Sequence, residues 1–275
     1  MRPPLSASTP QIVHPPLSQD PLRAAPGEDL ILFQGLVKAF GPKRIYDGLD
    51  FTIRRGEIHT LIGGSGTGKS VLLKCLLGLI RVDAGTIVFD GEVLTGKGEA
   101  AFFPVRKQIG MLFQGAALFD SLDVAANVSY PIREHYPDIS EAEIADRVAH
   151  KLELVGLPGV ERMRPSDLSG GMKKRVGLAR AIAVDPAVVL YDEPTTGLDP
   201  INTRRINELI LELNDRLGVT SLMVTHDMQS AYMVSDRMSM LFERRILITG
   251  TSDELRRSPI EEVQAFIGGM SDRET

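Results

Sequence analysis

The chain alternates between short apolar runs and longer stretches whose apolar residues recur at helical spacing. Runs typical of strands occur at residues 30–33, 49–53, 58–62, 86–91, 109–113, 187–193, 221–225, 238–242 and 246–249. Apolar residues recur at helical spacing in the stretch that begins at residue 69 and again over 206–217. Strands that alternate with helices predict an α/β domain with a mostly parallel sheet, and the last two strands predict a hairpin.

A helical block at residues 115–182 interrupts this alternation. Ser140 and Glu143 match the capping-box pattern at the start of one helix in the block. Gly156 and Pro158 predict the end of the same helix, because neither residue continues a helix well.

The two ends of the chain differ from the domain predicted at 30–266. Residues 1–28 hold seven of the 17 prolines, mixed with Ser, Ala and Gln. This composition builds no core and predicts a flexible tail. A Ser-Pro-x-Glu pattern at 258–261 predicts the cap of a last short helix, and 267–275 then form a C-terminal tail.

Composition narrows the classes of function. With 43% hydrophobic residues, the 275-residue chain can bury a sizeable core. Its net charge of −5 gives no basic field for nucleic acid, so we expect no nucleic-acid partner. The single cysteine, Cys75, excludes an internal disulfide, suits a reducing compartment and predicts a buried, unreactive thiol.

The apolar runs are too short for membrane insertion. None approaches the roughly 18 residues that a membrane-spanning helix needs. The N-terminus also lacks the apolar core of a signal peptide. We therefore expect a soluble, cytoplasmic protein that reaches a membrane only through a partner.

A glycine-rich turn joins the strand at 58–62 to the helix that follows. Its residues fit the phosphate-binding pattern G-x-x-x-x-G-K-S: Gly63, Gly64, Ser65, Gly66, Thr67, Gly68, Lys69 and Ser70. Glycines let the backbone pass close to a phosphate chain, and the following helix adds the positive end of its dipole. Lys69 is predicted to reach the β- and γ-phosphates, and the Ser70 hydroxyl to bind Mg²⁺.

Polar residues follow three of the predicted strands. Asp192 and Glu193 end a fully apolar strand, where open α/β sheets place their ligands. We predict that Asp192 joins Ser70 at Mg²⁺ and that Glu193 polarises the attacking water as general base. His226 is predicted to donate a hydrogen bond to the γ-phosphate, and Gln114 to reach the metal or its water.

Each residue has a plainer interpretation when taken alone. Glu193 can cap a helix, and His226 can cap a strand end. Ser169, Gly170 and Gly171 at a helix start form a second anion site or only a helix cap. Phe40 packs in the core or stacks on a nucleotide base, and its own sequence context favours packing.

The motifs together resemble the full set of the ABC ATPases, in the same order. They are the glycine turn at 63–70, Gln114, Leu-Ser-Gly-Gly-Met at 168–172, the apolar strand ending at Asp192-Glu193, Gly-Leu-Asp-Pro at 197–200, and His226. The resemblance covers about 30–266. It implies a P-loop NTPase fold with a RecA-like core, a small antiparallel β part and an inserted helical subdomain at about 115–182.

The resemblance also assigns roles that the residues alone leave open. In this family two ATPase domains face head to tail, and ATP lies between the glycine loop of one and the Ser-Gly-Gly signature of the other. Phe40 then takes the base-stacking position, Asp199 lies in a loop at the dimer interface, and Gln114 senses Mg²⁺. Met172 replaces the commoner glutamine, which we expect activity to survive because Ser169 and its two glycines contact phosphate.

The segment 105–135, with the signature, resembles the ATPases of Mla-type lipid transporters. That branch implies a second copy of the chain, an integral-membrane permease, an MCE-type substrate-binding protein and a STAS-domain partner. It places the chain at the cytoplasmic face of the inner membrane. The alternative is an importer ATPase for another small solute. A non-transport ABC protein is disfavoured, because the chain has one ATPase domain and no room for a long coiled coil between its two ATP motifs.

Overall fold

The computed structural model describes residue 17 and residues 22–269. Most of the predicted proline-rich tail and the end of the C-terminal tail therefore lie outside the described residues. Within the tail, the backbone N–H groups of Arg23 and Ala24 each donate to the Asp90 carboxylate at 2.8 Å. Leu22 and Ala24 pack against the apolar core.

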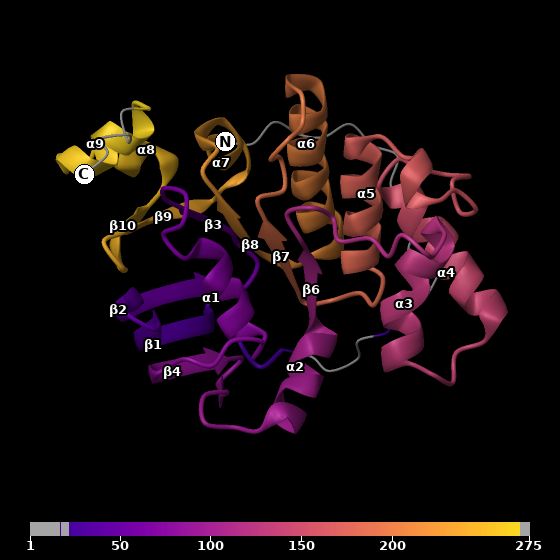
Figure 1. The fold of residues 1–275 in the computed structure, drawn as a ribbon, viewed down its shortest axis with the longest axis horizontal. Helices are drawn as coiled ribbons and strands as arrows, with labels where there is room; N and C mark the ends of the chain where they lie inside the picture. Colours follow the sequence, from indigo (N-terminus) through magenta and orange to yellow (C-terminus); the bar gives the residue numbers. More distant parts are fainter. Residues whose placement is uncertain (1–16, 18–21, 270–275) are drawn as a thin grey trace.

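Two sheets form the frame (Figure 1). The four-stranded antiparallel sheet has the order β2-β1-β4-β5, with β1 at Asp29–Phe40, β2 at Lys43–Arg54, β4 at Ala84–Phe89 and β5 at Glu92–Val93. The six-stranded sheet has the order β10-β9-β3-β8-β7-β6. Its strands are β3 at Ile58–Ile62, β6 at Ile109–Leu112, β7 at Val188–Asp192, β8 at Thr220–Thr225, β9 at Arg237–Phe242 and β10 at Arg245–Gly250. Strands β6, β7, β8, β3 and β9 are parallel and β10 pairs antiparallel to β9, which confirms the parallel sheet and the final hairpin.

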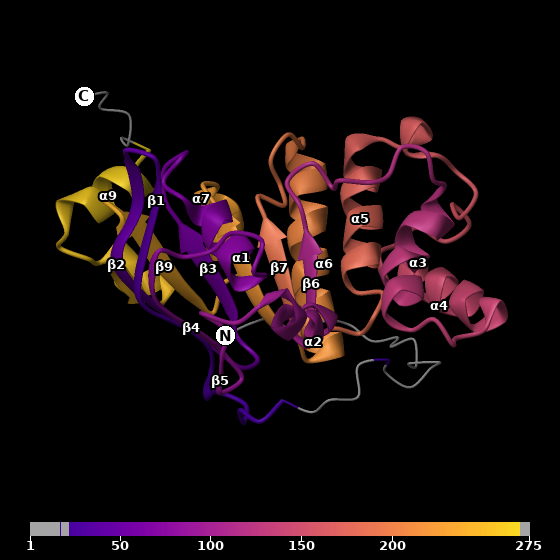
Figure 2. The same ribbon diagram turned by 60° about the horizontal axis from the view of Figure 1, so that its bottom comes forward.

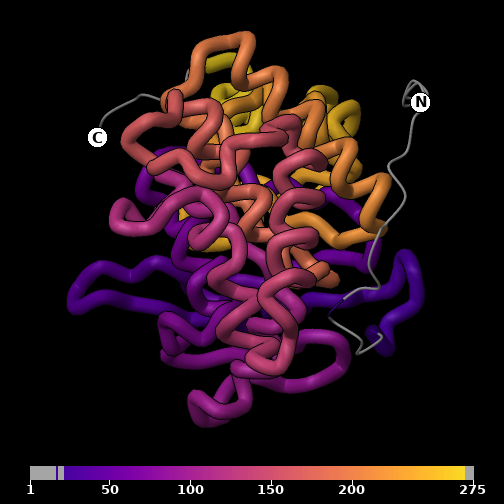
Figure 3. Tube along the Cα trace, turned by 90° about the vertical axis from the view of Figure 1, so that its right-hand side faces the viewer, coloured from indigo at the N-terminus to yellow at the C-terminus, as the bar shows by residue number. Residues whose placement is uncertain are grey.

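The helices divide into those around the sheets and those of a lateral lobe. Around the sheets lie α1 at Lys69–Leu76, α2 at Phe102–Gln108, α6 at Pro200–Leu217, α7 at Met228–Val234, α8 at Ser252–Arg256 and α9 at Glu261–Ile267. The helical lobe consists of α3 at Val124–His135, α4 at Glu141–Leu154 and α5 at Gly170–Ala181. Figures 1 and 2 place this lobe on the side away from the antiparallel sheet, and Figure 3 looks directly onto it. The predicted helical block thus forms one body.

The helical lobe shares its apolar core with the parallel sheet. Val128 of α3, Leu152 of α4 and Val176 of α5 belong to the same buried cluster as Tyr191 of β7 and Ile210 of α6. A second cluster packs the antiparallel sheet against α1, and a third joins β9 to α8 and α9. Burial at this scale is worth roughly 25 cal/mol per Å² of apolar surface, so the shared core ties the lobe firmly to the sheet.

The first two strands are longer than the apolar runs that predicted them. Each has 12 residues, and exposed and buried positions alternate along much of both strands. Only the continuous apolar parts, at 30–33 and 49–53, stand out in the sequence. The register of β1 against β2 also shifts between Phe33 and Leu36, where Gly35 has a φ of 58°. Such a bulge hides the two-residue period of a strand.

Two of the predicted helix caps differ in detail. Ser140 does accept from the Glu143 N–H, but the Glu143 carboxylate pairs with Arg147 one turn later instead of reaching back. The last helix begins at Glu261 with Ile260 as its N-cap and without a side-chain cap. Ser258 lies three residues before the helix and accepts from the Ile260 N–H, so its predicted capping role is wrong.

Candidate active site

The phosphate loop, residues 63–70, runs from buried strand β3 to the first turn of α1. Two of its glycines are required by close contacts. A Cβ on Gly63 would lie 2.7 Å from the Leu241 carbonyl oxygen, and one on Gly68 would lie 2.5 Å from Ile45. Gly68 also has a φ of 112°, a backbone angle that residues with a side chain rarely adopt. The Tyr46 hydroxyl donates to the Gly68 carbonyl at 2.6 Å and fixes the loop against the antiparallel sheet.

The Lys69 amine lies inside the phosphate loop. It donates to the carbonyls of Gly63 at 2.8 Å and Gly64 at 3.0 Å, and it lies 3.6 Å from Glu193 Oε1. Burial lowers the pKa of this amine, while the neighbouring Glu193 and Asp192 carboxylates act in the opposite direction. A buried cation held between a glycine loop and a carboxylate is placed to meet a phosphate group.

Ser70 and Asp192 form an oxygen pair beside the loop. The Ser70 hydroxyl donates to Asp192 Oδ1 at 2.6 Å, and the carboxylate comes from the buried end of β7. A hydroxyl and a carboxylate oxygen suit Mg²⁺, which usually keeps several waters and binds substrate phosphates. Within residues 22–269 no group of three or more His, Cys, Asp or Glu side chains could hold a metal by itself. The donor set therefore fits a magnesium ion that arrives with a nucleotide.

Glu193 is the first residue after β7, and its carboxylate is held from three sides. Oε2 accepts from the Thr196 hydroxyl at 3.1 Å and the Thr225 hydroxyl at 3.3 Å, and lies 2.9 Å from His226 Nδ1. The helix-cap alternative for Glu193 is wrong, because Asp199 caps α6 and Asp227 caps α7. The carboxylate is free of any capping role and points to the Lys69 amine.

One cavity of about 410 Å³ brings these residues together. It is lined by Phe40, Lys43, Ile45, Ser65, Gly66, Gly68, Lys69, Ser70, Val71, Gln114, Glu193 and His226. The Phe40 side chain is 46% exposed, so the packing interpretation is wrong, and an aromatic ring stands at the rim where a base can stack. Gln114 and His226 line the cavity from the ends of β6 and β8.

The signature residues lie elsewhere. Ser169 caps α5 by accepting from the Met172 N–H at 3.3 Å, and neither Ser169 nor its two glycines line the cavity. Asp199 caps α6 by accepting from the N–H groups of Ile201 and Asn202, both at 3.0 Å. These hydrogen bonds, those from Asn202 first, lower the pKa of Asp199. One chain therefore holds the phosphate loop and the carboxylates together but leaves the signature outside.

Lys174 has a role at the site that its sequence context does not reveal. Its buried amine donates to the carbonyl of Gln114 and, at 3.2 Å, to that of Glu193, so it joins the two loops that flank the cavity. Burial lowers the pKa of this amine. In the sequence it stands within a Lys-Lys-Arg run after the signature and reads as part of a solvated face. No spacing rule distinguishes it from its neighbour Lys173.

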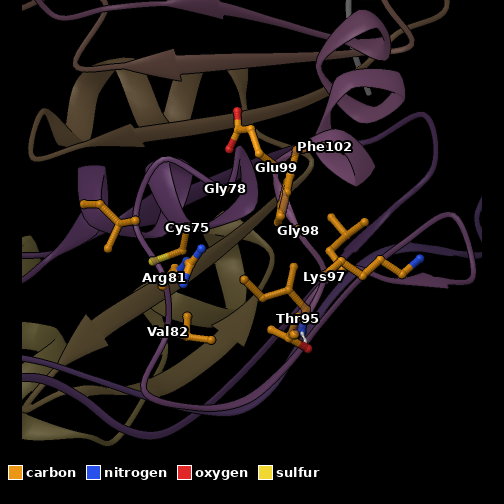
Figure 4. A pocket seen from close by; sticks show the side chains of 13 residues that line it. Cys75, Gly78, Arg81, Val82, Thr95, Lys97, Gly98, Glu99 and Phe102 are labelled. Carbon is orange, nitrogen blue, oxygen red and sulfur yellow. Dashed lines mark hydrogen bonds between the residues drawn. The ribbon is translucent and has the colours of Figure 1, made fainter.

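Cys75 lines a different cavity, of about 340 Å³, between α1 and the segment that joins β4 to α2 (Figure 4). Arg81, Lys97 and Phe102 line the same cavity. The Cys75 thiol is buried, as predicted, and burial raises its pKa to about 12, which disfavours the reactive thiolate.

Known proteins give three comparisons. The family model described as ABC transporter matches residues 46–196. MlaF, an intermembrane phospholipid transport system ATP-binding protein, is 40% identical in both Haemophilus influenzae and Escherichia coli K12. The match covers 89% and 84% of this chain and 92% and 86% of theirs. The mkl protein of Mycobacterium tuberculosis, a probable ribonucleotide transport ATP-binding protein, is 43% identical over 86% of this chain, which spans only 65% of the length of that relative.

Solved structures give the same result for the fold. The structure of cbiO1 from Clostridium perfringens, part of the ABC transporter complex cbiONQ, matches with a TM-score of 0.76 and 30% identity. The match covers 83% of this chain and 91% of cbiO1. A dimeric ATP-binding cassette in a post-hydrolysis state bound to ADP and Pi matches with a TM-score of 0.75 and 27% identity, over 81% and 98% of the two chains. Within residues 22–269, no helix combines the length and apolar character that a bilayer crossing requires.

Proposed function

The chain belongs to the ABC transporter family, and we propose that it is an ATPase subunit that powers phospholipid movement through a partner permease. The observation that carries the ATPase proposal is one cavity lined by residues of the phosphate loop, Ser70 among them, and by Glu193, with Asp192 hydrogen-bonded to Ser70. These are the parts that phosphoryl transfer to water requires: a phosphate cradle, a metal site and a base.

The side chains divide the chemistry between them. The loop N–H groups and Lys69 hold the phosphates, while Phe40 orients the base by stacking. Ser70 and Asp192, with Gln114 nearby, would hold Mg²⁺, which neutralises charge on the phosphates. Glu193 accepts the proton of the attacking water, and His226, 2.9 Å from that carboxylate, keeps it aimed. Lys69 must exchange its two backbone carbonyls for phosphate oxygens, which also frees Glu193 from the amine.

Hydrolysis requires a second copy of the chain. The signature residues cannot reach the cavity of their own subunit, because they lie in the helical lobe at the start of α5. A head-to-tail pair brings Ser169, Gly170 and Gly171 of one copy to the γ-phosphate held by the other. The dimeric cassettes among the similar structures support this arrangement. The free N–H groups at a helix start make the signature a suitable phosphate clamp.

The permease is proposed to bind a groove between the sheet and the helical lobe. The groove, of about 410 Å³, is lined mostly by apolar residues, among them Phe113, Phe119, Tyr130 and Pro131. Phe119 and Tyr130 are both exposed and their rings lie 4.9 Å apart. The groove begins next to Gln114, so a helix seated in it contacts the segment that lines the ATP cavity. This docking holds the chain at the cytoplasmic face of the inner membrane.

Phospholipid is the favoured cargo because the MlaF proteins match over nearly their whole length. The mkl relatives are slightly more similar, but about a third of their length has no counterpart here. Their name, probable ribonucleotide transport ATP-binding protein, supports a second candidate, in which the cargo is a ribonucleotide. We further propose an MCE-type substrate-binding protein and a STAS-domain protein as partners of the phospholipid system.

The test is purification of the tagged chain with its membrane partners, followed by reconstitution in phospholipid vesicles. We expect a permease and an MCE-type protein to copurify, and phospholipid transfer to depend on ATP. The same complex carrying Glu193→Gln is the matched control and should transfer nothing. ATP-dependent uptake of ribonucleotide without phospholipid transfer would replace the first candidate with the second.

A further inference from the structure

Asn202, on the first turn of α6, lies directly against the signature. A Cβ built on Gly171 would lie 2.7 Å from Asn202 Oδ1 and 3.0 Å from Asn202 Cγ. Gly171 is therefore not a free backbone position but one pressed against a side chain of another element. Figures 1 and 2 show α5 beside α6, with α3 and α4, the other helices of the helical lobe, on the far side of α5.

The same asparagine also binds the Asp199 loop. Its Nδ2 donates to Asp199 Oδ2, and its N–H donates to Asp199 Oδ1 at 3.0 Å. Rotation of the side chain away from Gly171 would break the Nδ2 bond, so the amide is held in place from the opposite side. Asn202 is thus fixed by Asp199 and in turn sets how closely the start of α5 can approach.

This contact connects to Glu193 through the turn that precedes α6. The Leu198 N–H donates to the Thr195 carbonyl at 3.2 Å, and the Thr196 N–H donates to the Glu193 carbonyl at 3.3 Å. Ile201, beside Asn202, is 80% exposed, so this end of α6 lies at the surface of the chain.

We infer that Asn202 is a positioning residue that sets the place of the Ser-Gly-Gly signature relative to the Asp199 loop and so to Glu193. The inference rests on the proposed function, since the signature acts on ATP held by a second copy. Asn202 touches no phosphate in this role. It holds Ser169 and the glycine N–H groups where they can contact the nucleotide bound by the second copy. It also makes the signature and the Asp199 loop move as one unit.

The first test is Asn202→Ala. ATP affinity of the single chain should be unchanged, because the phosphate loop and Phe40 are untouched. Maximal ATP turnover should fall about tenfold. When Asn202→Ala is added to the Glu193→Gln chain, ATP-driven dimerisation should need about tenfold more protein. Both effects have the size expected from the loss of one hydrogen bond to a charged group. Thr203→Ala, the next position on α6, is the matched control and should behave as the unchanged chain.

The second test uses Gly171→Ala alone and together with Asn202→Ala. Alone, the added methyl displaces the Asn202 amide and should lower turnover strongly. With Asn202→Ala, the two close contacts to Oδ1 and Cγ are gone, and the Cβ of residue 202 lies 3.5 Å from the new methyl, which is an ordinary van der Waals distance. Gly171→Ala should then cost little further activity. A purely local defect at Gly171 would cost the same in both backgrounds.

Turnover and dimerisation of Asn202→Ala that equal those of the unchanged chain would overturn the role of Asn202. An equal cost of Gly171→Ala in both backgrounds would overturn it too. If the unchanged chain hydrolyses no ATP in the assembled complex, the proposed function fails and the inference fails with it. Active wild-type chain together with an unaffected Asn202→Ala variant removes only the inference.

Discussion

At the scale of single residues, Glu193 has the backbone most out of the ordinary within the site. Its φ of 49° is left-handed, and it comes directly after five fully buried strand residues. Holding a non-glycine residue in this region costs of order 1–3 kcal/mol and requires surrounding contacts that fix it. The Thr196 and Thr225 hydroxyls and His226 supply those contacts. The strained turn aims the carboxylate off the sheet edge and into the cavity.

Replacing this carboxylate tests its role. Glu193→Gln should keep the shape and the threonine hydrogen bonds but remove the base, so turnover should fall at least about a hundredfold while ATP binding persists. Steady-state ATPase assays and nucleotide binding on the same preparation measure both. Near-normal hydrolysis by this variant would exclude Glu193 as the general base.

Site residues could be predicted from the sequence where they directly follow a recognisable strand. The phosphate loop, Glu193 and His226 each stand at a strand end in the sequence and line one cavity, and Asp192 is hydrogen-bonded to Ser70 of the loop. The roles of Lys174 and Thr225 could not be predicted, because both residues act through hydrogen bonds to groups 19 to 60 residues away in the chain. Phe40 was misjudged from context alone, since an aromatic residue at the end of a strand has the same pattern whether it is buried or exposed.

At the scale of elements, β3 carries a buried polar network through the centre of the sheet. His59 Nδ1 lies 2.9 Å from Glu57 Oε1, and Nε2 lies 2.8 Å from the Ser239 hydroxyl on β9. The ring stands edge-on to Phe51 of the antiparallel sheet, with centroids 4.9 Å apart. Burial lowers the pKa of His59, outweighing the opposite effect of Glu57, so the ring is neutral in the folded chain.

This network predicts a loss of stability in mild acid. Below about pH 6.5 the unfolded chain protonates His59 while the folded chain resists it, so the free energy of unfolding falls as the pH drops below that value. The slope from this one group can reach about 1.4 kcal/mol per pH unit. Urea unfolding at several pH values between 7.5 and 5.5 measures it. His59→Gln should flatten the curve, and an equally steep curve in that variant would assign the effect to other groups.

Strand β6 lies so close to α5 that only glycine fits at position 110. A Cβ there would overlap the Ala181 carbonyl at the end of α5. Gly110→Ala should therefore lower the free energy of unfolding by roughly 1–3 kcal/mol through overpacking. Gly98→Ala is the control, because nothing lies within 4 Å of its Cβ and its φ is −75°. Chemical denaturation compares the two, and equal stability of both variants would contradict the close packing of β6.

Strands could be predicted from the sequence where buried, mostly apolar residues follow one another with no exposed position between them. Strand β7 is buried throughout and stands out as an apolar run that ends at Asp192, while β3 and β8 are also fully buried and keep recognisable apolar residues between polar ones. Strands β1 and β2 alternate and contain bulges, so most of their length was not recognised. The Ser258 cap failed because the same pattern also closes a turn just before a helix.

At the scale of the whole molecule, the signature residues do not line the cavity of their own chain, and the proposed function brings them to it from a second copy. Two inactive variants should therefore repair each other when mixed before ATP is added. Ser169→Arg disables the signature, and Glu193→Gln disables the base. A mixed dimer keeps one site with intact loop, base and signature, so activity should recover to at most about a quarter of normal, given random pairing. A mixture no more active than the separate variants would contradict a site shared between two copies.

The position of the Lys69 amine has a consequence for the order of events. The amine is bonded to the Gly63 and Gly64 carbonyls and lies 3.6 Å from the Glu193 carboxylate. A triphosphate can bind this amine only if the amine leaves the two carbonyls and the Glu193 carboxylate. The carboxylate then loses its neighbouring positive charge when the substrate binds. We therefore expect nucleotide binding and release of the Glu193 carboxylate from Lys69 to occur in the same step, so that the proposed base becomes free only when a triphosphate is bound.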